Sequence, residues 1–193
     1  MIHDFEKIKV DAMLNIVYQM AIAAKTAPKA KGEDSVEIAV VDNKDKDKVA
    51  KVMHEIGAIT KDERWHRDAV NVEQADFILL LGIKRSDVLG ANCGACGFPT
   101  CEKMLSARSK DTPFPGPFCA FKLIDLGIAA GSAAKTASIL NLDNRIMFRV
   151  GVAAKQLNLI NADYILGIPV SATEKNPFFD RTKELYEQHL DQS

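Results

Sequence analysis

Apolar side chains recur three and four positions apart near the N-terminus, and this spacing predicts a helix over residues 5–25. The positions that carry it are Ile8, Val10, Met13, Leu14, Val17, Met20, Ala21 and Ala24. Pro28 and the polar stretch KAKGEDS are expected to end the helix, because proline and small polar residues favour turns.

Three short apolar runs bounded by turn formers predict β-strands. They are residues 36–42 (VEIAVVD), 76–83 (DFILLLGI) and 162–170 (ADYILGIPV). The second run contains no charged residue after Asp76 and is expected to be a buried strand.

Helical patterns occupy most of the remaining chain. We expect helices over residues 43–57, 61–75, 120–140, the later part of 145–157, and 181–192. Gly57 is expected to cap the first of these helices. Residues 171–180 are expected to form a loop, and the proline-rich stretch 111–118 can be neither helix nor central strand.

The alternation of helices with three or four short strands indicates an α+β (α/β-like) fold. At 193 residues the chain is long enough to bury a sizeable core as one domain. We expect a single domain over residues 1–193, with the segment 90–120 inserted into it.

The charge balance argues against several classes of partner. Lys and Arg number 25 and Asp and Glu 26, so no basic excess points to nucleic acid or an anionic membrane. The longest apolar stretch, residues 77–83, is too short to cross a bilayer, and the N-terminus lacks the layout of a signal peptide. We therefore expect a cytoplasmic protein that binds neither nucleic acid nor membrane.

All four cysteines of the chain fall within 27 residues. Cys93, Cys96, Cys101 and Cys119 follow the spacing C-x2-C-x4-C-x17-C. Thiols stay reduced in the cytosol, so clustered cysteines there indicate a metal site or a catalytic site before a disulfide. Zinc sites usually take two pairs of cysteines, whereas the last cysteine stands alone here, which favours an iron–sulfur cluster. A zinc site, a redox-active C-x-x-C pair and a chance grouping stay open as alternatives.

The residues between the cysteines suit a cluster. Gly94 and Gly97 allow the backbone conformations that point N–H groups at negatively charged sulfur. Pro99 is typical of a helix start, so we expect Cys101 near the N-terminus of a short helix. The stretch PFPGPF before Cys119 is expected to hold the returning chain stiffly.

The segment CGACGFPTC, together with Cys119, closely resembles the single-cluster motif of the B subunit of the Rnf electron-transport complex and of corrinoid iron–sulfur proteins. The resemblance implies that Cys93, Cys96, Cys101 and Cys119 bind one [4Fe–4S] cluster. The stretches AAKTAPKAKGED and GIPVSATEKNPFFDR also resemble uncharacterised bacterial and archaeal proteins described as containing a ferredoxin domain.

Residues 21–42 and 162–181 are similar to segments of the flavin-binding nitroreductases. This resemblance implies a nitroreductase-like helix–sheet–helix sandwich with the iron–sulfur segment inserted. It also implies FMN as a second cofactor, its phosphate held by a loop containing Lys25, Pro28, Lys29 and Lys31. Lys29 stands where that family has a serine, and three solvated lysines are the alternative reading of the loop.

Three functions follow from these interpretations. The first is a one-electron carrier with a [4Fe–4S] cluster that exchanges electrons with a redox partner protein. The second is an FMN-dependent reductase assisted by the cluster. The third is a structural or interaction protein in which the metal only stabilises the folded segment. No catalytic residue can be singled out, since the four histidines are scattered. The small-residue helix over 120–140 is a candidate homodimer interface.

Overall fold

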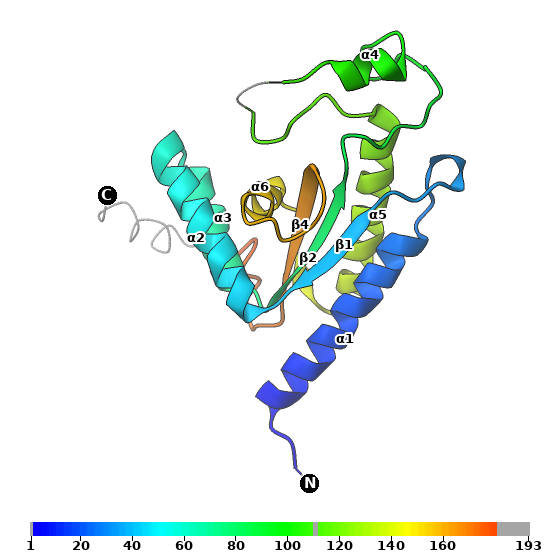
Figure 1. Cartoon of the computed structure of the whole chain (residues 1–193). Helices are drawn as coiled ribbons and strands as arrows, with labels where there is room; N and C mark the ends of the chain where they lie inside the picture. Colours follow the sequence, from blue (N-terminus) through cyan, green and yellow to red (C-terminus); the bar gives the residue numbers. More distant parts are fainter. Residues whose placement is uncertain (1, 110–111, 181–193) are drawn as a thin grey trace.

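A four-stranded antiparallel sheet with the strand order β1-β2-β4-β3 forms the middle of the molecule (Figure 1). This computed structural model describes residues 2–109 and 112–180. The strands are β1 (Glu37–Val41), β2 (Phe77–Ile83), β3 (Asp143–Asn144) and β4 (Tyr164–Ser171). The three strands expected from the sequence are confirmed. The two-residue strand β3 was not expected, because two residues are too short to show a periodic pattern.

The central strand β2 pairs with β1 on one side and with β4 on the other, and all seven of its residues are buried. Successive side chains of a strand point to opposite faces of the sheet. Leu79 and Leu81 accordingly join the core on one face, and Ile78 and Leu80 join the core on the other. Burial on both faces therefore explains the uninterrupted apolar run.

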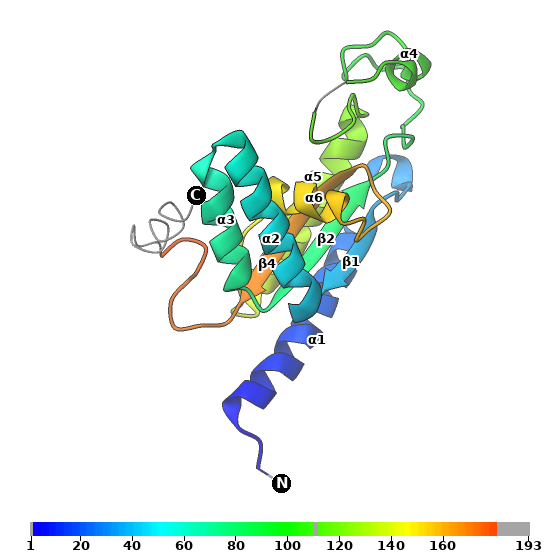
Figure 2. The same cartoon turned by 60° about the vertical axis from the view of Figure 1, so that its left-hand side comes forward.

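Five helices cover the two faces of the sheet (Figures 1 and 2). On one face lie α1 (Phe5–Thr26) and α5 (Ala120–Ile139), which pack against each other. On the other lie α2 (Asn43–Thr60), α3 (Glu63–Glu73) and α6 (Phe148–Gln156). The result is a sandwich of helices, sheet and helices.

Helix α6 lies unusually close to β4, and two glycines make this possible. A Cβ atom at Gly151 would lie 1.7 Å from the carbonyl oxygen of Ile165. A Cβ atom at Gly167 on the strand would lie 2.2 Å from the Val150 side chain. Both positions therefore exclude any larger residue.

The structure corrects one helix boundary, since Gly57 does not end α2, which continues to Thr60. A Cβ atom at Gly57 would lie 2.8 Å from Nε2 of His66 and 3.0 Å from Cβ of Trp65. This glycine thus serves the close packing of α2 on α3 rather than a helix cap. The helix expected over residues 181–192 lies outside the described residues.

Residues 84–109, which follow β2, and residues 112–118, which precede α5, form a lobe beyond the sheet (Figure 1). The lobe contains the short helix α4 (Cys101–Ser106) and has an apolar cluster of its own. Leu89, Met104 and Cys119 are its buried members. Among the described residues, no helix combines the length and the apolar character that a membrane span requires.

Candidate metal centre

The lobe is attached to the sheet by Arg85, which lies just after β2. The backbone N–H of Arg85 donates to the carboxylate of Asp163 at 2.9 Å. Its guanidinium group donates to the carbonyl oxygens of Met104, Leu105 and Ala107 at the end of α4. One side chain therefore satisfies three carbonyls that a helix end leaves without partners and fixes α4 relative to the sheet.

The Asp163 carboxylate is held in its charged form at this attachment. Burial raises the pKa of Asp163, but hydrogen bonds from the Arg85 N–H and the Lys155 ammonium, and the charges of both residues, outweigh burial. The pKa therefore lies below its ordinary value. Lys155 Nζ lies 3.1 Å from the carboxylate.

The first three cysteines lie on a loop that turns sharply at its glycines. Gly94 and Gly97 have φ angles of +74° and +85°, and the N–H of Gly97 donates to the carbonyl of Gly94 at 2.9 Å. Residues with a side chain rarely adopt such angles, so the turn depends on glycine as expected. Thr100 then caps α4 by accepting a hydrogen bond from the N–H of Lys103. Cys101 is the first residue of this helix, as the sequence predicted.

The fourth cysteine, Cys119, lies at the end of the segment that leads into α5. The carbonyl of Gly116 accepts a hydrogen bond from the N–H of Ser109 at 2.8 Å, which holds the two halves of the lobe together. The rings of Phe114 and Phe118 pack against Tyr164 of β4, with centroids 4.5 and 5.5 Å away. Cys119 is then placed at the N-cap of α5 and is buried.

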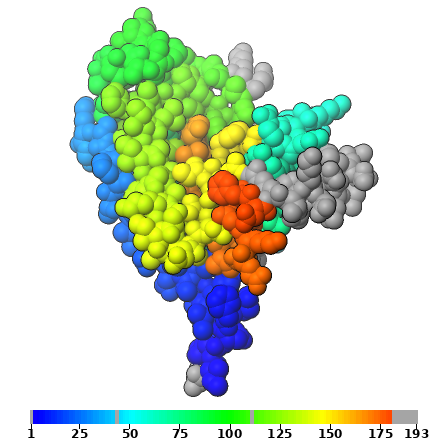
Figure 3. Space-filling model, turned by 180° about the vertical axis from the view of Figure 1, so that it is seen from behind, coloured from blue at the N-terminus to red at the C-terminus, as the bar shows by residue number. Residues whose placement is uncertain are grey.

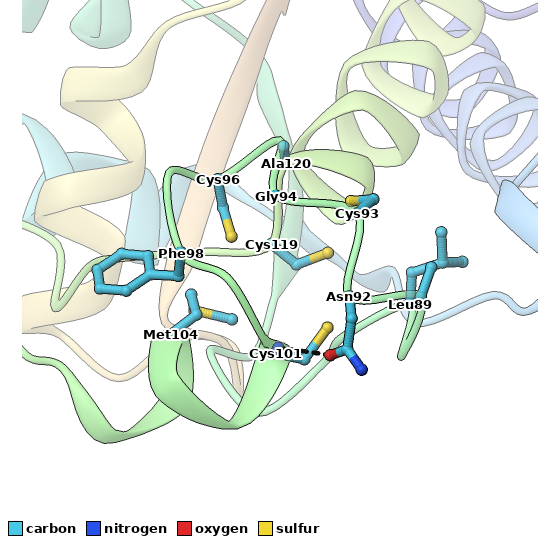
Figure 4. A pocket seen from close by; sticks show the side chains of 11 residues that line it. Leu89, Asn92, Cys93, Gly94, Cys96, Phe98, Cys101, Met104, Cys119 and Ala120 are labelled. Atoms are coloured by element: carbon cyan, nitrogen blue, oxygen red, sulfur yellow. Dashed lines mark hydrogen bonds between the residues drawn. The ribbon is translucent and has the colours of Figure 1, made fainter.

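All four cysteines line one cavity. Figure 4 shows their sulfur atoms around a common space between the loop and the start of α5. Leu89, Phe98 and Met104 provide apolar walls. The four thiols are free, and their exposure decreases from Cys93 (exposed) through Cys96 and Cys101 (half-buried) to Cys119 (6% exposed). The structure thus brings together the four residues that the sequence singled out.

Within the described part of the chain, no three cysteine, histidine or acidic side chains form a group that could hold a metal ion as the side chains stand. A tetrahedral zinc site with Zn–S bonds of about 2.3 Å requires sulfur atoms within about 4 Å of one another. A cubane cluster requires a wider spacing of the four cysteine sulfur atoms, because each thiolate binds a different iron atom.

Of the residues predicted to hold a flavin phosphate, Lys25 lies in the last turn of α1, and Pro28, Lys29 and Lys31 lie between α1 and β1. The ammonium groups of the lysines have partners within the chain. Lys29 is 3% exposed at its side chain and donates to the carbonyls of Ala24, Lys25 and Ala27. It thereby satisfies the C-terminal end of α1. Lys25, which is 62% exposed, forms an ion pair with Asp34, and Pro28 is exposed.

The loop between α1 and β1 packs behind the cysteines, because Ala30 contacts the apolar cluster formed by Leu89, Met104 and Cys119. Lys31 Nζ donates to the carbonyl of Leu89 at 2.9 Å. Two residues in the first turns of α5 also hold the loop: Lys122 Nζ donates to the carbonyl of Glu33, and Asp125 accepts from the N–H of Ala30. Both α5 side chains are almost fully buried. The loop over residues 29–33 and the cysteine site are therefore joined by side chains on both sides.

Several of these supporting residues were not found from the sequence. Arg85, Lys122 and Asp125 gave no signal for this role, since the backbone groups that they bind lie 19 or more residues away along the chain. Asn92 offered one hint, because asparagine tolerates positive φ next to glycine-rich turns, and its φ is +48°. Its partner, Cys101, is visible only in the folded loop.

Comparison with known proteins gives one family and one related sequence. A family model described as "Uncharacterized protein containing a ferredoxin domain (DUF2148)" matches residues 115–181, which include Cys119. A protein of Archaeoglobus fulgidus, described as "Uncharacterized protein", is 47% identical over 176 residues. The alignment covers 91% of this chain and 92% of that protein.

Comparison with solved structures identifies the fold as nitroreductase-like. A nitroreductase of Lactococcus lactis, in complex with chloramphenicol, aligns with a TM-score of 0.56 at 14% identity, over 94% of this chain and 84% of that one. A nitroreductase family protein of Clostridium novyi aligns with a TM-score of 0.54 at 10% identity, over 83% and 74%. An NADPH:FMN oxidoreductase of Vibrio harveyi, in complex with NAD+, aligns with a TM-score of 0.52 at 14% identity, over 87% and 63%. At these identities the likeness shows the fold alone.

Proposed function

Since the chain belongs to the family of uncharacterized proteins that contain a ferredoxin domain, we propose that it binds one [4Fe–4S] cluster through Cys93, Cys96, Cys101 and Cys119 and carries single electrons. The observation that carries this proposal is that all four cysteines, which lie up to 26 positions apart, line one cavity. The cluster supplies a reversible one-electron step, and the chain's residues decide how the cluster is held.

The chemistry of the cavity fits this cofactor. Four thiols match the four ligands of the cluster, and Gly94, whose φ is positive, lines the cavity beside them. The buried side chains of Leu89 and Met104 exclude water from part of the cavity wall. A drier, apolar surrounding is one of the factors that set the reduction potential of such clusters.

The test is to purify the chain without oxygen and measure iron, sulfide and zinc together with the visible absorption spectrum. We expect about four iron and four sulfide per chain and a broad visible band that dithionite bleaches reversibly. One zinc per chain without sulfide, or no metal at all, would contradict the proposal. A band that cannot be bleached without loss of the fold would favour a purely structural metal.

The variant Cys119→Ser separates a cluster from a redox-active C-x-x-C pair. A four-cysteine cluster becomes labile when its buried ligand is removed, and the iron content should fall. A thiol pair formed by Cys93 and Cys96 would keep its reactivity in this variant. Thr112→Ser, an exposed change in the same lobe, is the control and should keep the wild-type iron content.

A cluster-assisted, FMN-dependent reductase is the second candidate. It is supported by the nitroreductase-like fold and by the loop over residues 29–33, which contacts the cysteine lobe through Ala30 and Lys31. A flavin there could collect two electrons that the cluster delivers singly. Titration of the chain with FMN, followed by flavin fluorescence, tests it. Saturable quenching that weakens in Lys25→Ala is expected, and no quenching would contradict it.

We also propose that two copies associate through the outer side of α5. Ile124, Ile128 and Ile139 are exposed there, and Figure 3 shows this side of the helix (yellow-green) on the surface. Gly127 and Gly131 lie between them, with nothing within 4 Å of a Cβ atom placed on either. A glycine inside a helix lowers the stability of the helix by about 1 kcal/mol relative to alanine. Close approach of a second helix would explain why two glycines are present here.

Sedimentation equilibrium tests the dimer. We expect Ile128→Asp to convert a dimer into a monomer, because an unpaired carboxylate would be buried between the helices. Ile59→Asp, the same change at an exposed position of α2, is the control and should leave the mass unchanged. A monomeric wild type would contradict the proposal.

A further inference from the structure

The four cysteines differ in their exposure to solvent, so one side of the site is more open than the other. Cys119 is buried against the sheet end of the lobe, whereas Cys93 is exposed. The cavity walls contributed by Leu89 and Met104 are also buried. A group held by the four thiols would therefore be shielded on the Cys119 side and open to approach on the Cys93 side.

The segment that contains Cys93 has no acidic or basic residue and only short side chains. Residues 90–97 read GANCGACG, with no charged residue and no side chain longer than asparagine. A Cβ atom on any of the three glycines here would meet nothing within 4 Å, so open space lies outside the loop. Positive φ angles require these glycines, but they do not require the two alanines, Ala91 and Ala95, which are both exposed.

The lobe also projects from the rest of the molecule. In Figures 1 and 2 it lies beyond the end of the sheet, with α4 at the top, away from α2, α3 and the start of α1. The tip of the lobe therefore lies on the outside of the molecule, away from those helices.

We propose that residues 90–97 form the docking surface for a one-electron carrier protein, with Cys93 as the ligand nearest to the incoming electron. This inference rests on the proposed function. One electron passes from the reduced centre of the carrier to the oxidised cluster, and no bond forms or breaks. The rate of such a transfer falls steeply with the distance between the two centres, so a surface of short side chains favours it.

The absence of acidic and basic residues from 90–97 also indicates how a partner protein would bind there. Interfaces of electron-transfer proteins are small and short-lived. Since residues 90–97 contain no acidic or basic residue and their only charges are the cysteine thiolates that bind the cluster, ion pairs contribute little at this surface, and the rate should depend weakly on salt. A carrier that docks through a neutral rim around its own redox centre fits these properties.

The experiment compares two electron donors in an anaerobic stopped-flow instrument, using the cluster-loaded full chain. The donors are a reduced [2Fe–2S] ferredoxin and dithionite. In Ala95→Trp we expect reduction by ferredoxin to slow by about ten-fold and reduction by dithionite to change by less than about two-fold. Iron content and midpoint potential should stay at the wild-type values. Ser106→Trp, exposed on the same lobe but outside residues 90–97, is the control and should leave both rates unchanged.

Equal slowing with both donors, or equal slowing in Ser106→Trp, would overturn the docking surface. Reduction of the wild type by dithionite but not by ferredoxin would overturn it in favour of a small-molecule donor. A ferredoxin rate that falls steeply with salt would place the docking contacts at charged residues elsewhere. A chain that takes up no cluster fails at the iron measurement, before either rate is recorded, and this outcome overturns the proposed function itself.

Discussion

The side-chain oxygen of Asn92 accepts a hydrogen bond from the backbone N–H of Cys101, with 2.8 Å between the two atoms. This bond closes the loop that carries the first three cysteines and joins it to the first turn of α4. Asn92 also has a positive φ angle, which asparagine tolerates better than most residues. One side chain therefore fixes both the shape of the loop and the place of the third cysteine.

We expect Asn92→Ala to weaken the cluster site. The change removes a hydrogen bond worth about 1 kcal/mol and puts alanine in a conformation that costs it about 1 kcal/mol more. Asn92→Gly removes only the bond, so the cluster should be lost faster than in the wild type but more slowly than in Asn92→Ala. The rate of bleaching in the presence of an iron chelator measures this order. Equal rates in all three proteins would show that the bond does not hold the loop.

Arg85 provides a second test of how the lobe is held. In Arg85→Met, three carbonyls at the end of α4 lose their donor, and a loss of stability of about 2 kcal/mol is expected. Arg108→Met, an exposed change on the same lobe, should cost far less. Urea denaturation measures both. If the two variants unfold at the same urea concentration, Arg85 does not anchor α4.

The Asp163 carboxylate predicts a dependence of stability on pH. Its pKa is lowered in the folded chain, so its stabilising contribution is fully present above its unfolded pKa of about 3.9 and is lost as the pH falls through the folded value. We expect Asp163→Asn to lower the free energy of unfolding near neutral pH by less than about 1 kcal/mol, since the side chain is partly solvated. The difference from the wild type should vanish in acid.

Asp143 is a useful comparison, because its pKa is shifted in the opposite direction to that of Asp163. Burial and the nearby charge of Asp180 raise the pKa of Asp143, although a hydrogen bond from Asn176 opposes them. Its ionised form is therefore disfavoured in the folded chain, and Asp143→Asn should raise stability near neutral pH. Urea unfolding at several pH values compares both variants. Destabilisation by both at neutral pH would contradict the opposite signs.

Gly151→Ala should disrupt the packing of α6 on β4. The new Cβ atom would lie 1.7 Å from the Ile165 carbonyl oxygen, so the helix has to move, and we expect a loss of about 3 kcal/mol or more. The cysteine lobe lies beyond this contact and should keep its cluster in the fraction that folds. Thermal unfolding and iron content are the two measurements. A variant as stable as the wild type would mean that α6 shifts without cost.

Local sequence patterns were sufficient to predict a helix or strand wherever the residues of one segment show the periodicity of that element. The three longer strands and the helices α1, α3 and α5 follow from periodicity, and the start of α4 at Cys101 follows from the glycine and proline residues before it. Gly57 was misread as a helix cap, because a glycine required by a neighbouring helix looks the same in the sequence as one that ends a helix.

The sequence by itself determined the four thiols, their order along the chain and the turns between the first three, because spacing and glycine content are local properties. Only the tertiary structure decided that Cys119 joins the other three in one cavity and that Cys93 faces solvent. It also decided that Arg85, Lys122 and Asp125 support this region, because each reaches a partner distant in sequence. Such contacts depend on how the helices and the sheet pack, and no short stretch of residues specifies that packing.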